Sequence, residues 1–508
     1  MATSTASEHI SLPDYPLAPA TRGFLGRAGR MLVGDEWTWA ESGKTFDSFD
    51  PASGRVIARV ASAGEADIDK AVAAARNALE SSAWSVMLPA DRERALLKLA
   101  DLVEAHTDEL SELESLDNGK PLTVARMIDV GKAPAFIRYM AGWATKIEGS
   151  TMRPSVNLGP KTRLMAYTLK EPVGVVAAII PWNFPLAMAL WKICPALATG
   201  STVVLKPAEQ TPLSALRLGE LVLEAGIPAG VVNVVTGYGE TAGAALAGHR
   251  GINKIAFTGS TEVGKIIARA AAENVTRVSL ELGGKSPVIV LPDASVDAAI
   301  QGAARGIFFN SGQVCAAGSR LFVHRKIYDD VVQGVAEAAV RLKLGPGLRP
   351  DTQMGPLVSK EQQDRVLGFI DSGLEQGAKL VCGGRRSGGE GYFVEPTILG
   401  GTHADMRAAR EEIFGPVLAA SSFDELDEVV ARANDSEFGL AASVWSNDHS
   451  AIQRIVSRLK AGTVYVNAPN LVDPAVPFGG YKHSGYGREM ARTAIEMYTE
   501  TKSVILAY

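Results

Sequence analysis

Cys315 is the residue of this sequence best suited to nucleophilic chemistry. It stands in FFNSGQVCAAGSR, where a polar, turn-prone approach precedes it and small residues follow. Small neighbours leave room for a substrate carbon to reach the sulfur, and a helix beginning here would lower the thiol pKa below its free value of about 8.5. A lone cysteine is more often a small buried hydrophobic residue, so both interpretations stay open. The surrounding spacing matches no metal site.

Two further polar side chains stand at the ends of apolar, strand-like stretches. Glu281, in SLELGGKSP, would have a raised pKa beside apolar neighbours and could act as a general base, or it could form an ordinary salt bridge. Asn183, in IIPWNFPLAM, lies where α/β proteins place their ligands. Its amide could donate a hydrogen bond to an oxyanion, and a turn-forming asparagine is the plainer alternative.

Two other stretches suggest nucleotide binding. VVLKPAEQTP places Lys206 and Glu209 just beyond a strand end, where they could hold a ribose or form a surface charge pair. FTGSTEVGKI, residues 257–266, nearly satisfies the phosphate loop, but Ile266 stands where that loop needs a magnesium-binding hydroxyl. The missing hydroxyl disfavours a P-loop nucleotidase, so the turn is either a degenerate ATP site or a site for a different phosphate.

The elements that must position these residues indicate an α/β protein. Short Val/Ile-rich runs alternate with helical stretches in two series: VGVVAAII, STVVLKP, GVVNVVTG and KIAFTGS, then PVIVL, GSRLFVH, AASVWS and AGTVYVN. Such runs predict parallel strands buried on both faces. Upstream, residues 65–79 and 89–115 have the spacing of amphipathic helices, the second ending at Asn118-Gly119. The first 30 residues are polar and indicate an irregular arm.

The composition is that of an ordinary globular protein with more than one domain. The chain has 508 residues, 46% hydrophobic and 21% charged, with a net charge of −5 and no basic cluster for nucleic acid or an anionic membrane. The three cysteines are widely spaced, and Cys194 and Cys382 lie in contexts typical of structural residues. With no secretory signal pattern, we expect a reducing, cytoplasmic location.

Seven motifs together resemble the aldehyde dehydrogenase superfamily: PWNFP, KPAEQTP, FTGSTEVG, LELGGKSP, NSGQVC, EEIFGPV and PFGGYKHSGYGRE. The resemblance runs from about residue 30 to the C-terminus. It implies an α/β fold with two Rossmann-type parallel-sheet domains and a small β projection for oligomerisation. The implied division is an N-terminal arm (1–30), an NAD-binding domain (31–149 and 173–282), a catalytic domain (283–490) and oligomerisation segments (150–172 and 491–508). A homo-oligomer, with a tetramer favoured, is the implied assembly.

The resemblance also implies roles for matching residues. Cys315 would be the nucleophile, Glu281 the base that activates water, and Asn183 with the Cys315 N–H the oxyanion hole. Family members that transfer the acyl group to coenzyme A typically lack the glutamate, so Glu281 favours hydrolysis. The implied NAD-binding residues are Trp182, Lys206 and Glu209 at the adenosine half, Gly259 and Ser260 at the pyrophosphate, Glu412 at the other ribose and Phe414 beside it. Glu209 favours NAD over NADP, whereas Lys206 beside it leaves room for weaker NADP use.

The substrate implied by the resemblance is an arylalkyl aldehyde, with phenylacetaldehyde the best single choice. The positions that match the family's substrate tunnel are Phe184, Met188, Trp191, Phe309 and Phe478. The stretches RYMAGWATKIEG and NLVDPAVPFGG resemble bacterial phenylacetaldehyde dehydrogenases. We expect no basic residue to adjoin these tunnel positions, which disfavours carboxylated semialdehydes. The alternatives are a dehydrogenase of aliphatic or amino aldehydes and a non-catalytic binding protein on the same fold.

Overall fold

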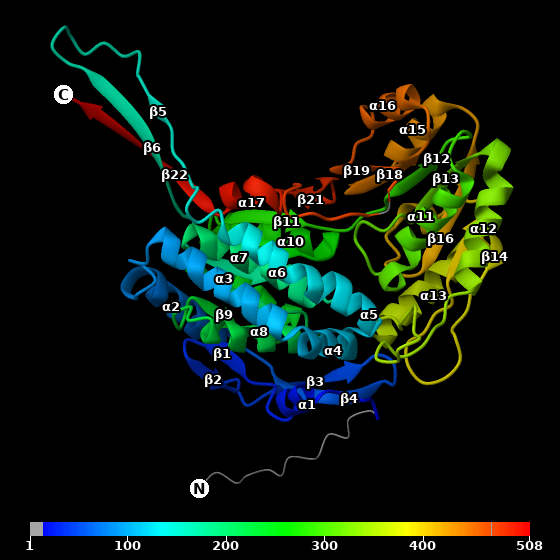
Figure 1. Cartoon of the computed structure of the whole chain (residues 1–508), viewed down its shortest axis with the longest axis horizontal. Coiled ribbons are helices and arrows are strands. Elements are labelled where there is room, and N and C mark those ends of the chain that lie inside the picture. Colours follow the sequence, from blue (N-terminus) through cyan, green and yellow to red (C-terminus); the bar gives the residue numbers. More distant parts are fainter. Residues whose placement is uncertain (1–13, 469) are drawn as a thin grey trace.

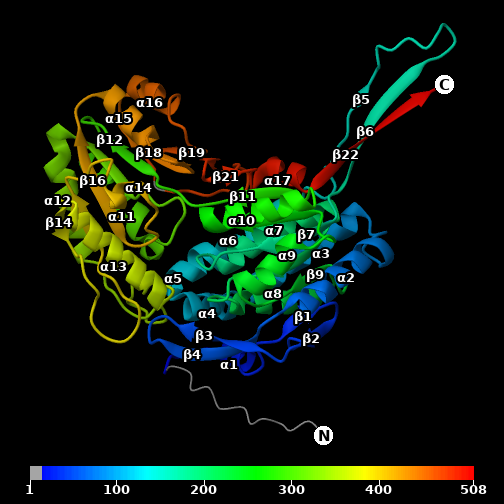
Figure 2. The same cartoon turned by 180° about the vertical axis from the view of Figure 1, so that it is seen from behind.

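The structure, a computed structural model, describes residues 14–468 and 470–508. Figure 1 shows two bodies built around separate sheets and a β arm that projects away from them, and Figure 2 shows the same arrangement from behind. Among the described residues, no helix is both long and apolar enough to cross a membrane.

The first large sheet has eight strands in the order β2-β1-β9-β8-β7-β10-β11-β21. Their bounds are β1 Met31–Val33, β2 Glu36–Thr38, β7 Val175–Ile179, β8 Thr202–Lys206, β9 Val232–Val234, β10 Lys254–Thr258, β11 Arg277–Glu281 and β21 Gly485–Tyr486. Strands β9, β8, β7, β10 and β11 run parallel, and every residue of β7, β8 and β10 is buried. The predicted first series of parallel strands is therefore confirmed.

Helices cover both faces of this sheet because the side chains of each central strand alternate between two cores. Val176 and Val203 pack with α3, α6, α7 and α8, whereas Val175 and Val204 pack with α2, α9 and α10. The helix bounds are α2 Glu65–Ser81, α3 Pro89–Ala105, α4 Thr107–Asn118, α5 Leu122–Val124, η1 Ala125–Val130, α6 Gly131–Ala141, α7 Pro185–Thr199, α8 Leu213–Glu224, η2 Gly239–Gly243, α9 Ala244–Gly248 and α10 Thr261–Glu273. This two-sided coverage buries the parallel strands.

The prediction of a single helix over residues 89–115 is wrong, because the stretch forms two helices. The chain leaves helical geometry at His106, with φ −100° and ψ 22°, and forms the two helices α3 and α4. Every residue of α4 from Glu109 to Asn118 is buried, so the kink turns the chain into the interior instead of along the surface. The predicted end is confirmed, because Gly119 adopts the left-handed conformation (φ 87°) that glycine tolerates.

The second large sheet has seven strands in the order β14-β15-β16-β13-β12-β18-β19. Their bounds are β12 Pro287–Val290, β13 Arg320–His324, β14 Lys379–Cys382, β15 Thr397–Gly400, β16 Val417–Phe423, β18 Ala441–Trp445 and β19 Thr463–Val466. All pairs are parallel except β14–β15. The second predicted series is confirmed as β12, β13, β18 and β19, and the sheet also contains β15 and β16, which that series omits.

Helices again cover the second sheet on both faces. Val288 packs with α11 and α12, whereas its neighbour Ile289 packs on the other face with α15 and α16. The bounds are α11 Val296–Phe308, η3 Phe309–Gly312, η4 Arg325–Ile327, α12 Tyr328–Val340, α13 Lys360–Glu375, α14 Arg407–Arg410, α15 Leu426–Asn434 and α16 His449–Val456. The clusters on the two faces of this sheet are distinct from those of the first sheet, and Ala441 and Tyr465 at its β18–β19 edge pack against the first body.

The projecting arm in Figure 1 is an antiparallel sheet of β5 (Thr151–Met152), β6 (Leu164–Pro172) and β22 (Thr499–Ala507). Strands β6 and β22 pair along their whole length, from Thr499↔Pro172 to Ala507↔Leu164. Helix α17 (Ala491–Met497) precedes β22. Apolar side chains of the arm are exposed, among them Met165, Leu169 and Ile505. The arm therefore carries apolar surface that its own sheet does not cover.

The remaining elements lie near the N-terminus, between α15 and β18, and between β19 and α17. Residues 14–30 are not irregular throughout: helix α1 (Pro19–Leu25) buries Phe24 and Leu25, and Thr21 hydrogen-bonds the Glu112 carboxylate. The rest of the predicted arm, residues 1–13, lies outside the described part of the chain. Two small sheets complete the fold, β3 (Thr45–Asp50) with β4 (Arg55–Ala61) and β17 (Phe438–Gly439) with β20 (Tyr481–Lys482).

Candidate active site

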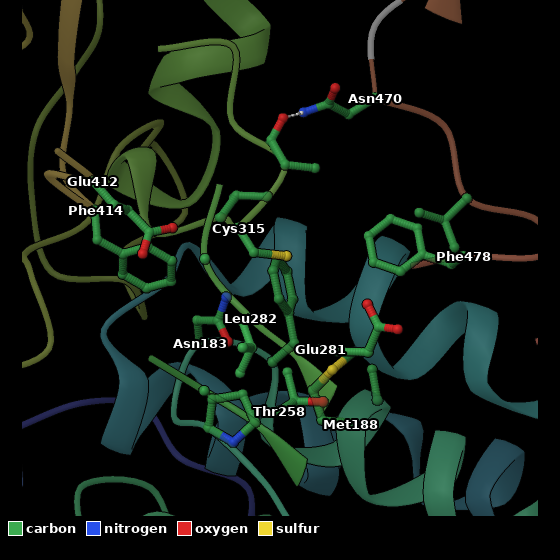
Figure 3. A pocket seen from close by; sticks show the side chains of 18 of the residues that line it. Asn183, Met188, Thr258, Glu281, Leu282, Cys315, Glu412, Phe414, Asn470 and Phe478 are labelled. Atoms are coloured by element: carbon green, nitrogen blue, oxygen red, sulfur yellow. Dashed lines mark hydrogen bonds between the residues drawn. The ribbon is translucent and has the colours of Figure 1, made fainter. Parts of the chain in front are cut away.

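A cavity of about 1310 Å³ brings together almost all the residues singled out in the sequence. Those on its wall are Cys315, Glu281, Asn183, Trp182, Gly259, Ser260, Glu412, Phe414, Phe184, Met188, Trp191, Phe309 and Phe478. Figure 3 shows the sulfur of Cys315 between Glu412 and Phe414 on one side and Glu281 and Phe478 on the other. Residues from both large sheets and from the connections after them thus meet at one place.

Asn183 is fixed by the turn that joins β7 to α7. Its side-chain amide donates to the backbone carbonyl of Gln313 at 2.9 Å, which ties it to the segment before Cys315. Its own backbone carbonyl accepts from the buried Lys120 ammonium at 2.9 Å, and Asn118 donates to the preceding carbonyl of Trp182 at 2.8 Å. Asn118 is the last residue of α4 and Lys120 follows two residues later, so the buried end of that helix holds the turn in place.

Cys315 does not begin a helix, so the expected lowering of its thiol pKa is wrong. The preceding 3-10 turn η3 contains Asn310 and Ser311 with positive φ, and Cys315 follows in a turn. Burial, with a smaller effect of the negative charges of Glu412 and Glu281, raises the pKa of the Cys315 thiol to about 12. The side chain is half-buried and reaches the cavity. In this state it is a protonated thiol at neutral pH.

Glu281, the last residue of β11, is buried without a partner for its carboxylate. Neither oxygen has a hydrogen bond among the described residues, which excludes the salt-bridge alternative within that part of the chain. Burial raises its pKa well above the ordinary value, the neighbouring Glu489 adds to the shift, and Lys192 and Arg488 oppose it. A carboxyl whose pKa is raised is a stronger base when it is ionised, which suits it to take a proton from water.

Two buried charges behind Glu281 were not identified from the sequence. The Lys192 ammonium contacts a Glu489 carboxylate oxygen at 2.6 Å and the Thr258 hydroxyl at 2.7 Å. Lys192 lies in LWKICPAL, where a lysine inside an otherwise apolar helix is a usable signal, because an unpaired buried ammonium would be costly. Glu489 comes from a distant part of the chain, and only the fold places it there.

The side of the cavity near Glu412 has the features of a site for a polar ligand. The Glu412 carboxylate accepts the Gly284 backbone N–H at 2.8 Å, and burial raises its pKa to about 7. A Cβ at Gly283 would lie 2.2 Å from this carboxylate, so only glycine allows the approach. Trp182 and Phe414 meet edge to face at 5.1 Å between ring centroids. Ser260 caps α10 by accepting the Val263 N–H at 3.3 Å.

Lys206 and Glu209 are the two selected residues that do not line the cavity. They lie beyond the end of β8, where the Lys206 ammonium contacts the Glu209 carboxylate at 3.4 Å and also donates to the Pro207 carbonyl at 3.1 Å. Lys206 is buried and Glu209 is half-buried. The structure therefore contains the charge pair that was one of the two interpretations of this stretch.

The other half of the cavity is aromatic. Phe184 stacks on Phe309 at 6.2 Å between centroids, and Trp191 contacts Phe478 at 5.7 Å. The sequence analysis missed Phe136, which stacks on Trp191 at 6.2 Å. Further wall residues that it missed are Tyr465, Asn470, Lys132 and Arg305. The Asn470 side chain donates to the Ala316 carbonyl at 3.0 Å (Figure 3).

The expectation that no basic residue adjoins the tunnel is wrong. The Lys120 ammonium lies 4.6 Å from the Phe184 ring centroid, although it is engaged by Asp129 at 2.7 Å. Lys132 and Arg305 also belong to the cavity wall. Lys132 lies four residues before Phe136 in α6, a spacing that places side chains on one face of a helix. Arg305 lies in the last turn of α11, four residues before Phe309, which follows the end of that helix.

Comparison with known proteins agrees with this geometry. The sequence profile of the aldehyde dehydrogenase family matches residues 37–504. The chain is 54% identical over 481 residues to the phenylacetaldehyde dehydrogenase of Pseudomonas fluorescens, covering 94% of this chain and 96% of that protein. It is 53% identical over 481 residues to the putative aldehyde dehydrogenase DhaS of Bacillus subtilis, covering 95% and 96%.

A solved structure is similar over almost the whole chain. The NAD+ complex of an aldehyde dehydrogenase from Bacillus cereus superposes with a TM-score of 0.94 at 50% identity, covering 97% of this chain and 99% of that one. The likeness extends over both sheets and the arm, not over the motifs alone. The chain belongs to the aldehyde dehydrogenase family.

Proposed function

We propose that this chain oxidises an aldehyde to the carboxylic acid with NAD, through an acyl group held on Cys315. The observation that carries this proposal is the meeting of Cys315, Asn183 and Glu281 on one cavity wall, from three separate segments of the chain. Each residue supplies a different function that the reaction needs: a soft nucleophile, a neutral donor and a movable base.

The Cys315 thiol gives its proton to water in the cavity, the resulting thiolate attacks the aldehyde carbon and forms a carbon–sulfur bond, and the carbonyl oxygen becomes an oxyanion. Asn183 has two amide protons and donates one of them to Gln313, so the second remains for the oxyanion, together with the Cys315 backbone N–H. After loss of hydride the acyl group is a thioester on Cys315. Glu281 takes a proton from water, whose oxygen then displaces the sulfur and releases the acid.

The residues near Glu412 fit NAD. The Glu412 carboxylate can accept from ribose hydroxyls, and the α10 N-terminus with Ser260 is suited to a pyrophosphate. The Lys206–Glu209 pair would lie toward the adenosine half, where Glu209 would disfavour the 2′-phosphate of NADP. Bound NAD would supply the hydride acceptor. The NAD+ complex of the similar Bacillus cereus enzyme supports the assignment.

The substrate class that fits the aromatic half is an arylalkyl aldehyde, with phenylacetaldehyde as the best candidate. Phe184, Phe309, Trp191 and Phe478 offer apolar faces for a ring, and Met188 adds an adaptable wall. Burying a phenyl ring in place of a methyl group contributes roughly 2–3 kcal/mol. The name of the Pseudomonas fluorescens relative supports the same class.

The test is NADH formation by the purified protein with phenylacetaldehyde, acetaldehyde, betaine aldehyde and succinic semialdehyde, each assayed with NAD and NADP. Phenylacetaldehyde should exceed acetaldehyde in kcat/KM by about tenfold or more. NAD should be used more efficiently than NADP. A higher kcat/KM for any of the other three aldehydes would overturn the substrate assignment, and no turnover of any aldehyde would overturn the proposed reaction.

A further inference from the structure

Two cations at the aromatic half of the cavity have no partner to hold them. Lys132, in the first turn of α6, and Arg305, near the end of α11, are exposed and line the cavity. Neither side chain forms an ion pair, hydrogen bond or ring contact with any of residues 14–468 and 470–508. A side chain that is both exposed and on the wall lies where the cavity meets solvent.

The other cations on the wall differ in this respect. Arg365 donates to the Glu412 backbone carbonyl at 2.9 Å, and Arg407 contacts the Glu411 carboxylate at 3.1 Å. Arg410 donates to the Ala404 carbonyl at 3.0 Å. Each of these three side chains therefore already has a partner within the protein.

Lys132 and Arg305 share the aromatic half with the rings that would hold the substrate. Lys132 lies one helical turn before Phe136, which stacks on Trp191. Arg305 lies one turn before Phe309, which stacks on Phe184. The ligand-binding features near Glu412 come from other segments of the chain.

Nearby carboxylates do not neutralise both charges. Asp129 lines the same half, but it is buried and contacts the Lys120 ammonium at 2.7 Å. Glu489 is engaged by Lys192. Asp473 is exposed and uses one carboxylate oxygen to accept the Ala475 N–H at 2.8 Å in its own turn. Two cations therefore face one exposed carboxylate, and the remaining charge is positive.

We propose that Lys132 and Arg305 form an anion-recognising mouth, so that the enzyme accepts aromatic aldehydes with a carboxylate at the far end of the ring. The inference rests on the proposed aldehyde oxidation and specifies its substrate class further. The aldehyde carbon would approach Cys315, the ring would lie among the aromatic side chains, and the distal carboxylate would stay in the partly hydrated mouth. Because the charges are exposed, the expected effect is moderate and sensitive to salt.

The test compares two aldehydes with their carboxylated counterparts: benzaldehyde with 4-carboxybenzaldehyde, and cinnamaldehyde with 4-carboxycinnamaldehyde. The measured quantity is the ratio of kcat/KM for the carboxylated aldehyde to that for its parent, with NAD saturating. In Lys132→Met/Arg305→Met this ratio should fall by roughly three- to tenfold for at least one pair, without loss of activity toward the parent. In the unmodified enzyme the same ratio should fall as salt is raised.

The matched control is Lys98→Met/Arg250→Met, which removes one exposed lysine and one exposed arginine away from the cavity. It makes the same change in net charge and should leave the ratio unaltered. An unchanged ratio in the mouth variant would overturn the proposal. An equal loss of kcat/KM for the carboxylated and the parent aldehydes would also overturn it, as would a variant in which only the KM for NAD changes. If the mouth variant is unstable, a salt-independent ratio in the unmodified enzyme contradicts the proposal. Absence of turnover with every aldehyde would instead contradict the proposed function.

Discussion

Gly479 leaves the space that the Glu281 carboxylate occupies. A Cβ at Gly479 would lie 2.6 Å from Oε1 of Glu281, inside any allowed contact. Both Glu281 carboxylate oxygens are buried without a hydrogen bond within the described chain, and the space for one of them depends on a glycine that is far away in sequence.

Gly479→Ala should displace Glu281 and slow release of the acid. We expect steady-state turnover to fall at least about tenfold while a first burst of NADH remains, because attack by Cys315 does not require that carboxylate position. Gly368→Ala is the control, since nothing lies within 4 Å of a Cβ built there. Stopped-flow measurement of NADH separates the burst from steady-state turnover. Normal steady-state turnover in Gly479→Ala would contradict the prediction that displacing the Glu281 carboxylate slows release of the acid.

The raised thiol pKa predicts how Cys315 reacts with iodoacetamide in the absence of NAD. With a pKa of about 12, the thiolate fraction rises with every unit of pH, so the alkylation rate should increase from about pH 7 to pH 10 without a plateau. Glu412→Gln removes a negative charge that raises this pKa, so alkylation at fixed alkaline pH should be faster. Glu361→Gln is the control, because it removes a carboxylate of the cavity wall that does not contribute to the raised pKa of the Cys315 thiol. A plateau below pH 8 would refute the raised pKa.

The proposed oxyanion role of Asn183 predicts a defect in acylation. Asn183→Ala should lower the single-turnover rate of NADH formation by roughly 10²–10³, as for loss of an oxyanion donor. Some of that loss would come from the freed Gln313 carbonyl, so alkylation of Cys315 should be measured beside it. A raised KM with unchanged turnover would be incompatible with the role.

Much of the fold and of the site can be predicted from the sequence, because both depend on local signals. Strands β7, β8 and β10 are buried on both faces and appear as unbroken apolar runs. The motif after β7 carries Asn183, and the motif at the end of β11 carries Glu281. What could not be predicted depends on contacts between distant segments. Glu489 meets Lys192 across 297 residues, and Gly479 meets Glu281 only through the folded chain.

The pKa of Cys315 shows a second limit of sequence reasoning. The small residues around it correctly indicated an accessible sulfur, but the expected helix is absent. The thiol environment is set instead by burial and by Glu281 and Glu412, which come from other elements. Likewise, Lys132 and Arg305 lie outside the quoted motifs, and nothing in the local sequence shows that their helices bring them to the cavity wall.

The β arm predicts a homo-oligomer that depends on its last strand. Deleting residues 500–508 removes nearly all of β22 and leaves β6 with an unpaired edge and exposed apolar side chains. We expect aggregated or dissociated protein, measured by light scattering after size-exclusion chromatography. As a control, Lys502→Ala removes only an exposed ion pair with Glu171 and should keep the assembly. An active oligomer of unchanged size after truncation would contradict the prediction.

The acyl group on Cys315 is the central claim, and trapping it is the most direct test. Glu281→Gln enzyme mixed with NAD and phenylacetaldehyde should give one burst of NADH and then slow turnover, because the thioester forms but is hydrolysed slowly. Mass spectrometry after acid quench should find one phenylacetyl group on the peptide that contains Cys315, and none in the additional variant Cys315→Ala. NADH formation without that adduct, or an adduct on Cys194 or Cys382 instead, would contradict the account.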